Sequence, residues 1–554
     1  MKLFNKFKKL QSLIFVGTIV VFSMLFISFD DTDDFDLAKN LDIYQTLIRE
    51  LRLYYVDDIQ SAKIIQTSIE QMLESLDPYT VFYPESKIED FKFMTTGQYG
   101  GIGALIRKDR GNIIIEQVYK NYPAEKAGIR PGDVIKKVEN KIIDNKNTDD
   151  ISEMLKGVPN TDVVLSIYRP FTKENLNITV TRQKIQVKNV PYFGMINSET
   201  GYIKLTGFTQ SAYEEVKQAL VNLKEKNATQ IIFDLRSNPG GLLNEAVKIV
   251  GLFVDKGTEV VSTRGKMQQW NQTLETPRQP VDTEMDIVVL VNSNSASASE
   301  IVSGALQDLD RAVIVGQRTY GKGLVQTTRD LSYNAKLKIT TAKYYIPSGR
   351  CIQALDYTHR NPDGSVGHVP DSIITEFKTK NGRSVYDGGG ILPDIKVELQ
   401  KIDPLSKYLM KNYIIFDYAN IYRFLNDKIS TAANYSITDK EYNDFISYVV
   451  ERNVNYETET DKALTEFINT AKNEKYYDKL SSDIKLLEDD LSHNVKDDLI
   501  LFKDDIKEML NRSIVVRYYY ESGLIQYAIN NDPEVKKGLE LLSNDTKYRN
   551  ILMN

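Results

Sequence analysis

The sequence is poor in the residues that build covalent and metal cross-links. Its 554 residues include one cysteine, Cys351, and three histidines, His359, His368 and His493. A single cysteine excludes an internal disulfide framework and a multi-cysteine zinc site, and three histidines leave little for a histidine-built metal centre. The sequence also contains neither a Gly-x-x-x-x-Gly-Lys-Ser/Thr loop nor a His-Glu-x-x-His helix. We therefore expect a protein that works without a metal, a nucleotide or another cofactor.

An excess of positive charge is missing as well. The 70 basic and 76 acidic residues give a formal net charge of −6, and the pI is about 5.5. Because no basic surface is available to bind phosphates, we expect no nucleic-acid partner. Hydrophobic residues make up 42% and charged residues 26%, which excludes a largely disordered chain and a polytopic membrane protein. At about 150 residues per domain, the chain should hold three or four folded parts.

The N-terminus carries a long apolar run. The stretch from Leu13 to Phe29 contains no charged residue, four lysines precede it, and a cluster of aspartates follows it. This pattern is typical of an export signal, with a buried core helix as the alternative. The run is short for a membrane span and no clear small-x-small cleavage site follows, which favours an uncleaved anchor. Residues 1–30 thus predict a signal peptide or membrane anchor, with the remainder in the periplasm or cell envelope, held at the inner membrane.

After residue 30 the chain divides into four regions. Residues 31–85 repeat apolar side chains at helical spacing, and residues 86–184 hold short β-branched runs between glycine and proline turns. Residues 185–400 alternate strand-like and helix-like stretches, which predicts helices packed on a mixed sheet. The predicted fold class is therefore α/β multidomain, in which a β-rich module precedes an α/β core and an all-α domain, residues 401–554, ends the chain.

The C-terminal region differs from the rest in composition. Residues 401–554 hold only two of the 30 glycines and two of the 16 prolines, and their 21 basic and 27 acidic residues account for the whole net charge. Few helix breakers and many charges are typical of an acidic helical domain. Since no catalytic pattern is visible there, we interpret it as a scaffold or a surface for a partner.

A glycine-containing loop marks the β-rich module. The run Gly100-Gly101-Ile102-Gly103 is followed by Ala127-Gly128-Ile129 and by Gly132-Asp133-Val134-Ile135. The loop alone fits a turn in any small β module, but with the later runs at this spacing the module resembles a PDZ domain. The resemblance implies that the four loop residues offer backbone N–H groups to a free carboxylate. It also implies that a sheet edge takes up a peptide as an extra strand.

A serine-rich stretch lies between an expected strand and an expected helix. It reads Asn292-Ser293-Asn294-Ser295-Ala296-Ser297-Ala298-Ser299-Glu300. A serine at such a junction is exposed, and the following helix N-terminus supplies positive potential and N–H groups to a developing oxyanion. From the residue types alone, the stretch also fits a linker or a simple N-cap.

A lysine between two glycines can supply the base that a serine nucleophile needs. It is Lys322, within Gly321-Lys322-Gly323. The glycines allow its backbone to approach another element closely, and burial of the side chain would lower the pKa of the ammonium group. A neutral lysine could then accept the serine proton.

These segments, with Asp234-Leu235-Arg236-Ser237-Asn238-Pro239-Gly240-Gly241 upstream, resemble the carboxyl-terminal processing peptidases, also called tail-specific proteases. In that family the middle serine of Ser-Ala-Ser-Ala-Ser-Glu is the nucleophile, and the lysine of Gly-Lys-Gly follows 25 residues later, as Lys322 follows Ser297 here. The resemblance implies that Gln326 orients the lysine. It further implies oxyanion donors in the N–H groups of Ala298 and Gly240. It covers about residues 40–400.

The implied enzyme is an exported serine endopeptidase that holds the C-terminal tail of a protein substrate in its PDZ domain. It would cleave through an acyl-enzyme, and its partners would be protein or peptide substrates with a free C-terminus. The family also implies an adaptor protein and a homodimer as further partners. By the same resemblance, Arg169 near the end of a PDZ strand would face the active site as a sensor.

Two other functions are weighed against this one. His359 and His368 lie in a polar loop with several aspartates, so a serine–histidine–aspartate esterase-type hydrolase stays open, although no Gly-x-Ser-x-Gly elbow is present. The other alternative is a catalytically inactive PDZ scaffold, against which the joint presence of the serine, lysine and glutamine argues. Cys351 has no base beside it in the sequence and is interpreted as a small buried residue, and His493 as a surface residue.

Overall fold

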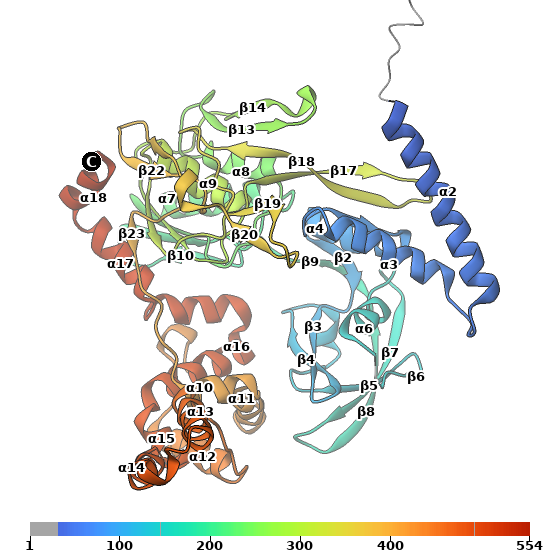
Figure 1. The fold of residues 1–554 in the computed structure, drawn as a ribbon. Coiled ribbons are helices and arrows are strands. Elements are labelled where there is room, and N and C mark those ends of the chain that lie inside the picture. The colour runs from blue at the N-terminus through green and yellow to red at the C-terminus, as the bar shows by residue number, and fades with distance from the viewer. Residues whose placement is uncertain (1–30, 145, 492–493, 554) are drawn as a thin grey trace, which may run out of the picture. The chain divides into compact units, whose positions relative to one another are not determined.

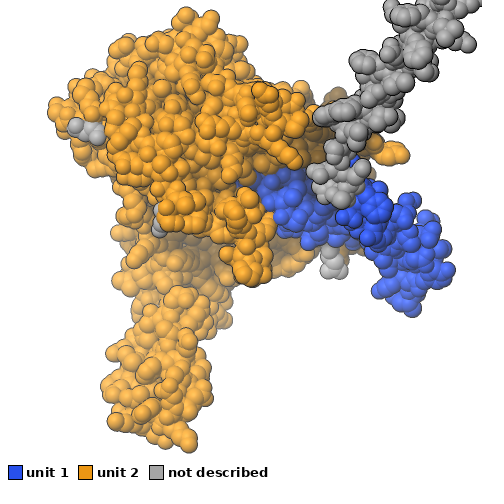
Figure 2. Space-filling view, turned by 45° about the horizontal axis from the view of Figure 1, so that its top comes forward, with its two compact units in different colours: residues 1–82 blue, residues 83–554 orange. Residues whose placement is uncertain are grey.

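The computed structural model describes residues 31–144, 146–491 and 494–553. The predicted signal or anchor segment, residues 1–30, lies outside the described residues, as does His493. The chain divides into two compact units, residues 1–82 and residues 83–554, which Figure 2 shows in different colours. Within the described ranges, no helix is both long enough and apolar enough to cross a membrane.

The described part of the first unit is helical, as its apolar spacing predicts. α2 spans Asp31–Tyr54 and α3 spans Ser61–Glu74. Asp77 shapes the turn after these helices, because its side chain accepts hydrogen bonds from the backbone N–H groups of Tyr79 and Thr80, both at 2.8 Å. A carboxylate that binds the backbone two and three residues further on fixes a tight turn. β1 (Val81–Tyr83) crosses the boundary between the units.

The β-rich module is an antiparallel sheet in the second unit. Its order is β3-β4-β5-β7-β8, with β6 paired to β5, so β3 lies at one end of the order. Alternate residues of β7, such as Val163, Leu165 and Ile167, are buried in the module's core, as expected for a sheet with one covered face. Its elements are β3 (Ala104–Asp109), β4 (Asn112–Val118), α5 (Pro123–Lys126), β5 (Val134–Val138), β6 (Lys141–Ile142), α6 (Thr148–Leu155), β7 (Asp162–Arg169) and β8 (Glu174–Thr181).

A six-stranded mixed sheet forms the α/β core (Figure 1). β10 pairs antiparallel with β11, and the remaining neighbours are parallel. The central strands are buried on both faces and therefore read as continuous apolar runs rather than alternating ones. In sheet order the strands are β10 (Tyr192–Met195), β11 (Thr200–Lys204), β12 (Gln230–Asp234), β15 (Asp286–Val291), β16 (Val313–Gly316) and β23 (Ile395–Lys396).

Helices cover both faces of this sheet. Ile231 and Phe233 of β12 belong to a core with α7 (Ala212–Glu225), α8 (Leu243–Val250) and α9 (Ala298–Asp308). Ile232, on the opposite face of the same strand, belongs to a core with the two C-terminal helices, α17 (Pro533–Leu542) and α18 (Asp545–Met553). Gly538 lets α17 approach closely, because a Cβ there would lie 3.2 Å from the Ile232 side chain. The end of the C-terminal region thus completes the layers of the α/β core.

A second antiparallel sheet carries the segment that follows Lys322. β17 (Leu324–Asp330) pairs with β18 (Lys336–Tyr345), which pairs with β13 (Glu259–Gly265), and β13 also pairs with β14 (Gln272–Glu275). The β17–β18 register shifts between Val325 and Gln326. Three two-stranded sheets complete the strands: β2 (Gln98–Gly101) with β9 (Gln183–Gln186), β19 (Leu355–Arg360) with β20 (Val366–His368), and β21 (Glu376–Lys378) with β22 (Ser384–Tyr386).

The remainder of the C-terminal region is helical and has a core of its own, rich in tyrosine. Its longest helix, α16 (Lys503–Ile529), is interrupted at Tyr520, whose φ of 59° and ψ of −163° are not helical. The other helices are α10 (Pro404–Lys411), α11 (Ile414–Leu425), α12 (Asp439–Val450), α13 (Glu459–Asn473), α14 (Tyr477–Asp490) and α15 (Val495–Leu501).

This helical core contacts the β-rich module. The buried guanidinium of Arg107 in β3 lies 3.3 Å from the ring centroid of Tyr413 and 4.2 Å from that of Phe416. The Tyr520 hydroxyl donates a hydrogen bond to Glu125 of the module. A cation held against aromatic faces away from water is strongly attracted to them, so these contacts join the module to the helical core within the second unit.

Candidate active site

Ser297 occupies the turn between β15 and α9. Its φ of 55° and ψ of −113° lie in a region that non-glycine residues rarely adopt. The hydroxyl groups of the two neighbouring serines form hydrogen bonds to the backbone. Ser295 donates to Leu235 O at 2.9 Å, and Ser299 donates to Asn238 O at 2.9 Å. Both are fully buried, whereas Ser297 is half-buried. A strained strand-to-helix turn that presents one serine is the geometry of a nucleophile.

The carboxylate of Glu300 ties the serine turn to the lysine segment. Its Oε2 accepts from the N–H groups of Ser297 at 2.8 Å and Lys322 at 2.9 Å. Its Oε1 accepts from Gly321 N at 2.7 Å and Thr319 Oγ1 at 2.5 Å. Burial raises the pKa of this carboxyl, and the donated hydrogen bonds oppose that rise. One buried side chain therefore fixes two segments that are 25 residues apart in sequence.

Ser297 and Lys322 line the same cavity, which has a volume of about 400 Å³. Lys322 is half-buried there, between the buried Gly321 and Gly323. The cavity wall is largely apolar and comes from several elements, so it offers space for side chains of a bound chain. The other lining residues are Phe91, Met94, Thr95, Pro239, Gly240, Gly241, Leu242, Leu243, Ala298, Ile301, Leu324, Val325, Gln326, Thr328, Lys338 and Tyr344.

The turn at Gly240 lies directly against Ser297. A Cβ on Gly240 would lie 2.8 Å from Ser297 Cβ and 2.8 Å from Ala298 N, and the residue's φ is +96°, so only glycine fits. Its N–H group donates to the Asn238 side-chain oxygen at 2.9 Å. By contrast, no acceptor in the described part of the chain binds the N–H of Ala298, the first residue of α9. An unbonded N–H at a helix N-terminus can accept a developing oxyanion.

Gln326 lies in the cavity wall on β17, and its amide donates to Thr340 Oγ1 at 3.2 Å across the β17–β18 hairpin. Tyr344, on β18, is buried, and its hydroxyl donates to Ser297 O at 3.3 Å. Burial raises the pKa of the Tyr344 hydroxyl well above its ordinary value. The β17–β18 hairpin therefore contributes Gln326 and Tyr344 to the wall of the cavity.

The histidines of the alternative triad lie elsewhere. His359 and His368 belong to the β19–β20 hairpin, where both are exposed, and neither lines the cavity with Ser297. His359 Nδ1 instead lies 2.8 Å from the Asp356 carboxylate.

Cys351 is half-buried, and burial raises the pKa of its thiol, which disfavours the reactive thiolate.

The loop predicted to bind a carboxylate consists of the end of β2 and the two residues that follow it. Gly100 and Gly101 pair with β9 as part of β2, whereas Ile102 is buried and Gly103 has a φ of +76°. No acceptor among the described residues binds the N–H groups of Ile102 and Gly103. Arg169, which the family resemblance places facing the active site, is buried in the module with Nε 2.8 Å from Asp133 Oδ1, and it is not among the residues that line the cavity with Ser297.

The structure brings together residues that the sequence assigned to the site and adds others. Glu300 ends the serine-rich stretch but received no role, although Ser297-x-x-Glu300 has the spacing of a capping box. Phe91, Met94 and Thr95 of α4 (Ile88–Thr96) also line the cavity. No local signal identifies these α4 residues, because they reach the site through tertiary packing.

Three family models match the chain. Peptidase family S41 matches residues 199–366, a PDZ domain matches residues 114–169, and a probable PDZ-protease C-terminal helical domain matches residues 405–542. The PDZ resemblance of the β-rich module and the helical character of the C-terminal region are thus confirmed.

The chain is also similar to proteins with curated names, and these are proteases as well. The chain is 36% identical over 324 residues to a carboxy-terminal-processing protease of Bartonella bacilliformis, covering 58% of this chain and 74% of that protein. It is also 36% identical over 348 residues to a probable CtpA-like serine protease of Staphylococcus aureus strain MRSA252, covering 62% and 68%. Among solved structures, a photosystem II D1 C-terminal processing protease aligns with 26% identity over 64% of this chain and 86% of its own, with a TM-score of 0.36.

Proposed function

This chain belongs to the carboxy-terminal-processing proteases of peptidase family S41, and from that membership we propose a serine–lysine mechanism with selection of substrates by their C-terminal tails. The chain is a serine-type peptidase with a PDZ domain. The observation that carries the mechanism is that one buried carboxylate, Glu300, binds the N–H groups of both Ser297 and Lys322 at the edge of one cavity.

In this mechanism Ser297 Oγ attacks the carbonyl carbon of a peptide bond while Lys322 takes the hydroxyl proton. The tetrahedral oxyanion accepts a hydrogen bond from Ala298 N–H. Lys322 then passes its proton to the leaving amine, and an acyl-enzyme forms on Ser297. Water gives a proton to the same lysine and attacks the ester, and the lysine returns that proton to Ser297 Oγ as the product leaves. Gly240 N–H becomes the second oxyanion donor once the Asn238 side chain releases it, and Gln326 helps to orient the lysine.

Tail selection is assigned to the PDZ domain. The N–H groups of Ile102 and Gly103 would bind the substrate carboxylate, with Gly100 and Gly101 shaping the loop. β3 ends the order of the PDZ sheet, which supports its use as the edge that a substrate tail joins as an added strand. The tail would thus be held while a more distant segment enters the cavity at Ser297.

We test tail selection with an unstructured reporter polypeptide that ends in a carboxylate or in an amide. The full chain, purified in detergent, should cleave the carboxylate form with a kcat/KM about tenfold higher or more, because charge-assisted hydrogen bonds to the terminus are lost in the amide. Gel analysis and mass spectrometry of the products give the rates. Ser297→Ala is the control: it should bind the carboxylate form and yield no product. Equal cleavage of both forms would contradict tail selection.

We also propose that residues 1–30 direct export and hold the protein at the inner membrane, facing the periplasm. The lysines before the apolar run and the aspartates after it support this orientation. The full chain should then resist extraction from membranes by alkali, and deletion of residues 1–30 should leave it in the soluble cytoplasmic fraction. Extraction of the full chain by alkali would refute the anchor.

The region 401–554 is the proposed contact for an adaptor protein or for a second copy in a homodimer.

A further inference from the structure

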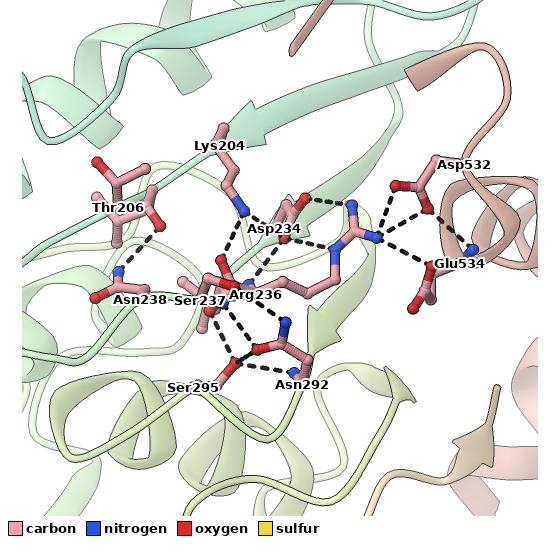
Figure 3. A network of polar contacts seen from close by, with 12 residues as sticks. Lys204, Thr206, Asp234, Arg236, Ser237, Asn238, Asn292, Ser295, Asp532 and Glu534 are labelled. Carbon is pink, nitrogen blue, oxygen red and sulfur yellow. Dashed lines mark hydrogen bonds and ion pairs between the residues drawn. The ribbon is translucent and has the colours of Figure 1, made fainter. Parts of the chain in front are cut away.

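Arg236 lies between carboxylates from distant parts of the chain (Figure 3). On one side, its Nε and Nη2 donate to the two oxygens of Asp234 at 3.0 and 2.6 Å. On the other side, Nη1 donates to both oxygens of Asp532 at 2.8 and 2.7 Å and to Glu534 Oε2 at 3.1 Å. Asp532 caps the N-terminus of α17, and Glu534 lies in its first turn. The arginine therefore links the end of β12 to the C-terminal region.

The charged side chains joined by Arg236 are largely buried. The side chains of Arg236, Asp532 and Glu534 are 14%, 13% and 12% exposed. Burial acts to raise the pKa of Asp234 and to lower that of Arg236, but attraction from Lys204 and Arg236 holds the carboxyl pKa below its ordinary value, and the carboxylates hold the arginine pKa above its own. The groups of this pair therefore stay charged near neutral pH and are weakly screened by salt.

The backbone after Arg236 leads directly to the oxyanion turn. Its carbonyl accepts from Lys204 Nζ at 2.7 Å, and the next N–H, of Ser237, donates to Asn292 Oδ1 at 2.8 Å. Asn238 O then accepts from Ala296 N at 3.0 Å, one residue before the nucleophile. Gly240 follows two residues later, against Ser297 Cβ. A shift of Arg236 would thus move the turn that faces the reacting atoms.

Apolar contacts also hold α17 in place. Val535, Leu541 and Leu542 bury the helix on the core sheet through apolar contacts. When Asp532 and Glu534 lose their charge, Arg236 keeps its pairing with Asp234, so no uncompensated buried charge is left to destabilise the fold. Glu534 is also held by Gln317, whose Nε2 donates to its Oε1 at 2.9 Å. Two carboxylates on a firmly packed helix are therefore suited to fixing the direction of an arginine rather than to anchoring the helix.

We propose that Asp532 and Glu534 are positioning residues of the peptidase: from the C-terminal helical region they hold Arg236, and through it the Gly240 turn, in the geometry that stabilises the oxyanion at Ser297. This inference rests on the proposed serine–lysine function. It gives the end of the C-terminal region a role in catalysis that is independent of any partner it binds.

The test is the double variant Asp532→Asn/Glu534→Gln in the full chain. Both changes keep the shape of the side chain and remove its charge, and asparagine is as good an N-cap as aspartate. We expect kcat for the reporter polypeptide to fall about tenfold or more with KM nearly unchanged, because small displacements of catalytic geometry are costly. Affinity for a peptide boronate, which forms an oxyanion-like adduct on Ser297, should fall by the same factor, and the melting temperature should change little.

Glu540→Gln is the matched control. Glu540 lies on the same helix, but it is exposed and, within the part of the chain that the structure describes, its ion pairs are with Lys537 and Lys547. Its substitution removes a charge from α17 without touching Arg236, so kcat and boronate affinity should equal those of the wild type.

A variant cycle with Arg236→Gln separates positioning from general weakening of the fold. If the carboxylates act through Arg236, adding the double variant to Arg236→Gln should lower kcat no further. Additive losses, or a wild-type kcat in the double variant, would overturn the inference while leaving the proposed function intact. Absence of Ser297-dependent cleavage by the wild type would overturn the proposed function and the inference with it.

Discussion

Replacing Lys322 by alanine is expected to lower kcat by about 10³-fold or more, with KM for the reporter polypeptide little changed. In the proposed mechanism the lysine accepts the proton of Ser297 Oγ, and removal of a base that acts with its nucleophile costs nearly as much as removal of the nucleophile. The lysine lies in the same cavity as the serine, and Glu300 fixes its backbone. Single-turnover cleavage of the reporter measures the loss directly in the acylation step.

Lys322→Arg separates a base from a positive charge. Arginine retains the charge but does not release its proton in proteins, so this variant should be as inactive as the alanine variant. His359→Gln and His368→Gln should keep wild-type kcat, because both side chains are exposed on a hairpin outside the cavity. Substantial activity in Lys322→Arg, or its loss in either histidine variant, would contradict the serine–lysine assignment.

The sequence predicts those parts of the molecule that depend on local order along the chain. Ser297 lies in a motif between a buried strand and a helix N-terminus, and glycines flank Lys322, so the motifs alone suggest both residues as candidates for the site. The PDZ module could be predicted for the same reason, since its turns lie at fixed spacing. The layers of the α/β core follow from alternating strand and helix patterns.

What the sequence could not predict depends on tertiary contact. The apolar stripe of α17 shows that the helix is buried, but not that Val535 meets the second face of the core sheet. The capping-box spacing of Glu300 predicts a bond to its own helix, but not its bonds to Gly321 and Lys322. The hydrogen bond from Gly240 N–H to Asn238 depends on a side-chain rotamer, which no sequence pattern specifies.

Glu300→Gln is expected to lower kcat by about 10²-fold or more and to destabilise the fold by about 3 kcal/mol. The carboxylate accepts four hydrogen bonds in a fully buried site. An amide has one acceptor oxygen, and its NH₂ group would face two of the donors, so buried N–H groups would lose their partners. The strained turn of Ser297 and the backbone of Lys322 would then no longer be held in one geometry. Reporter kinetics and thermal unfolding measure the two losses.

Glu441→Gln distinguishes the catalytic from the structural part of this effect. Glu441 has the same local role in the capping box of α12, where it accepts a hydrogen bond from Thr438 N at 2.8 Å, but it lies in the C-terminal helical region and does not line the cavity with Ser297 and Lys322. Its substitution should reduce stability without changing kcat below the melting temperature. If Glu300→Gln behaved in the same way, the carboxylate would stabilise only its own helix. The coupling of the Ser297 turn to the Lys322 segment would then have to arise from the neighbouring strands β15 and β16, which precede them.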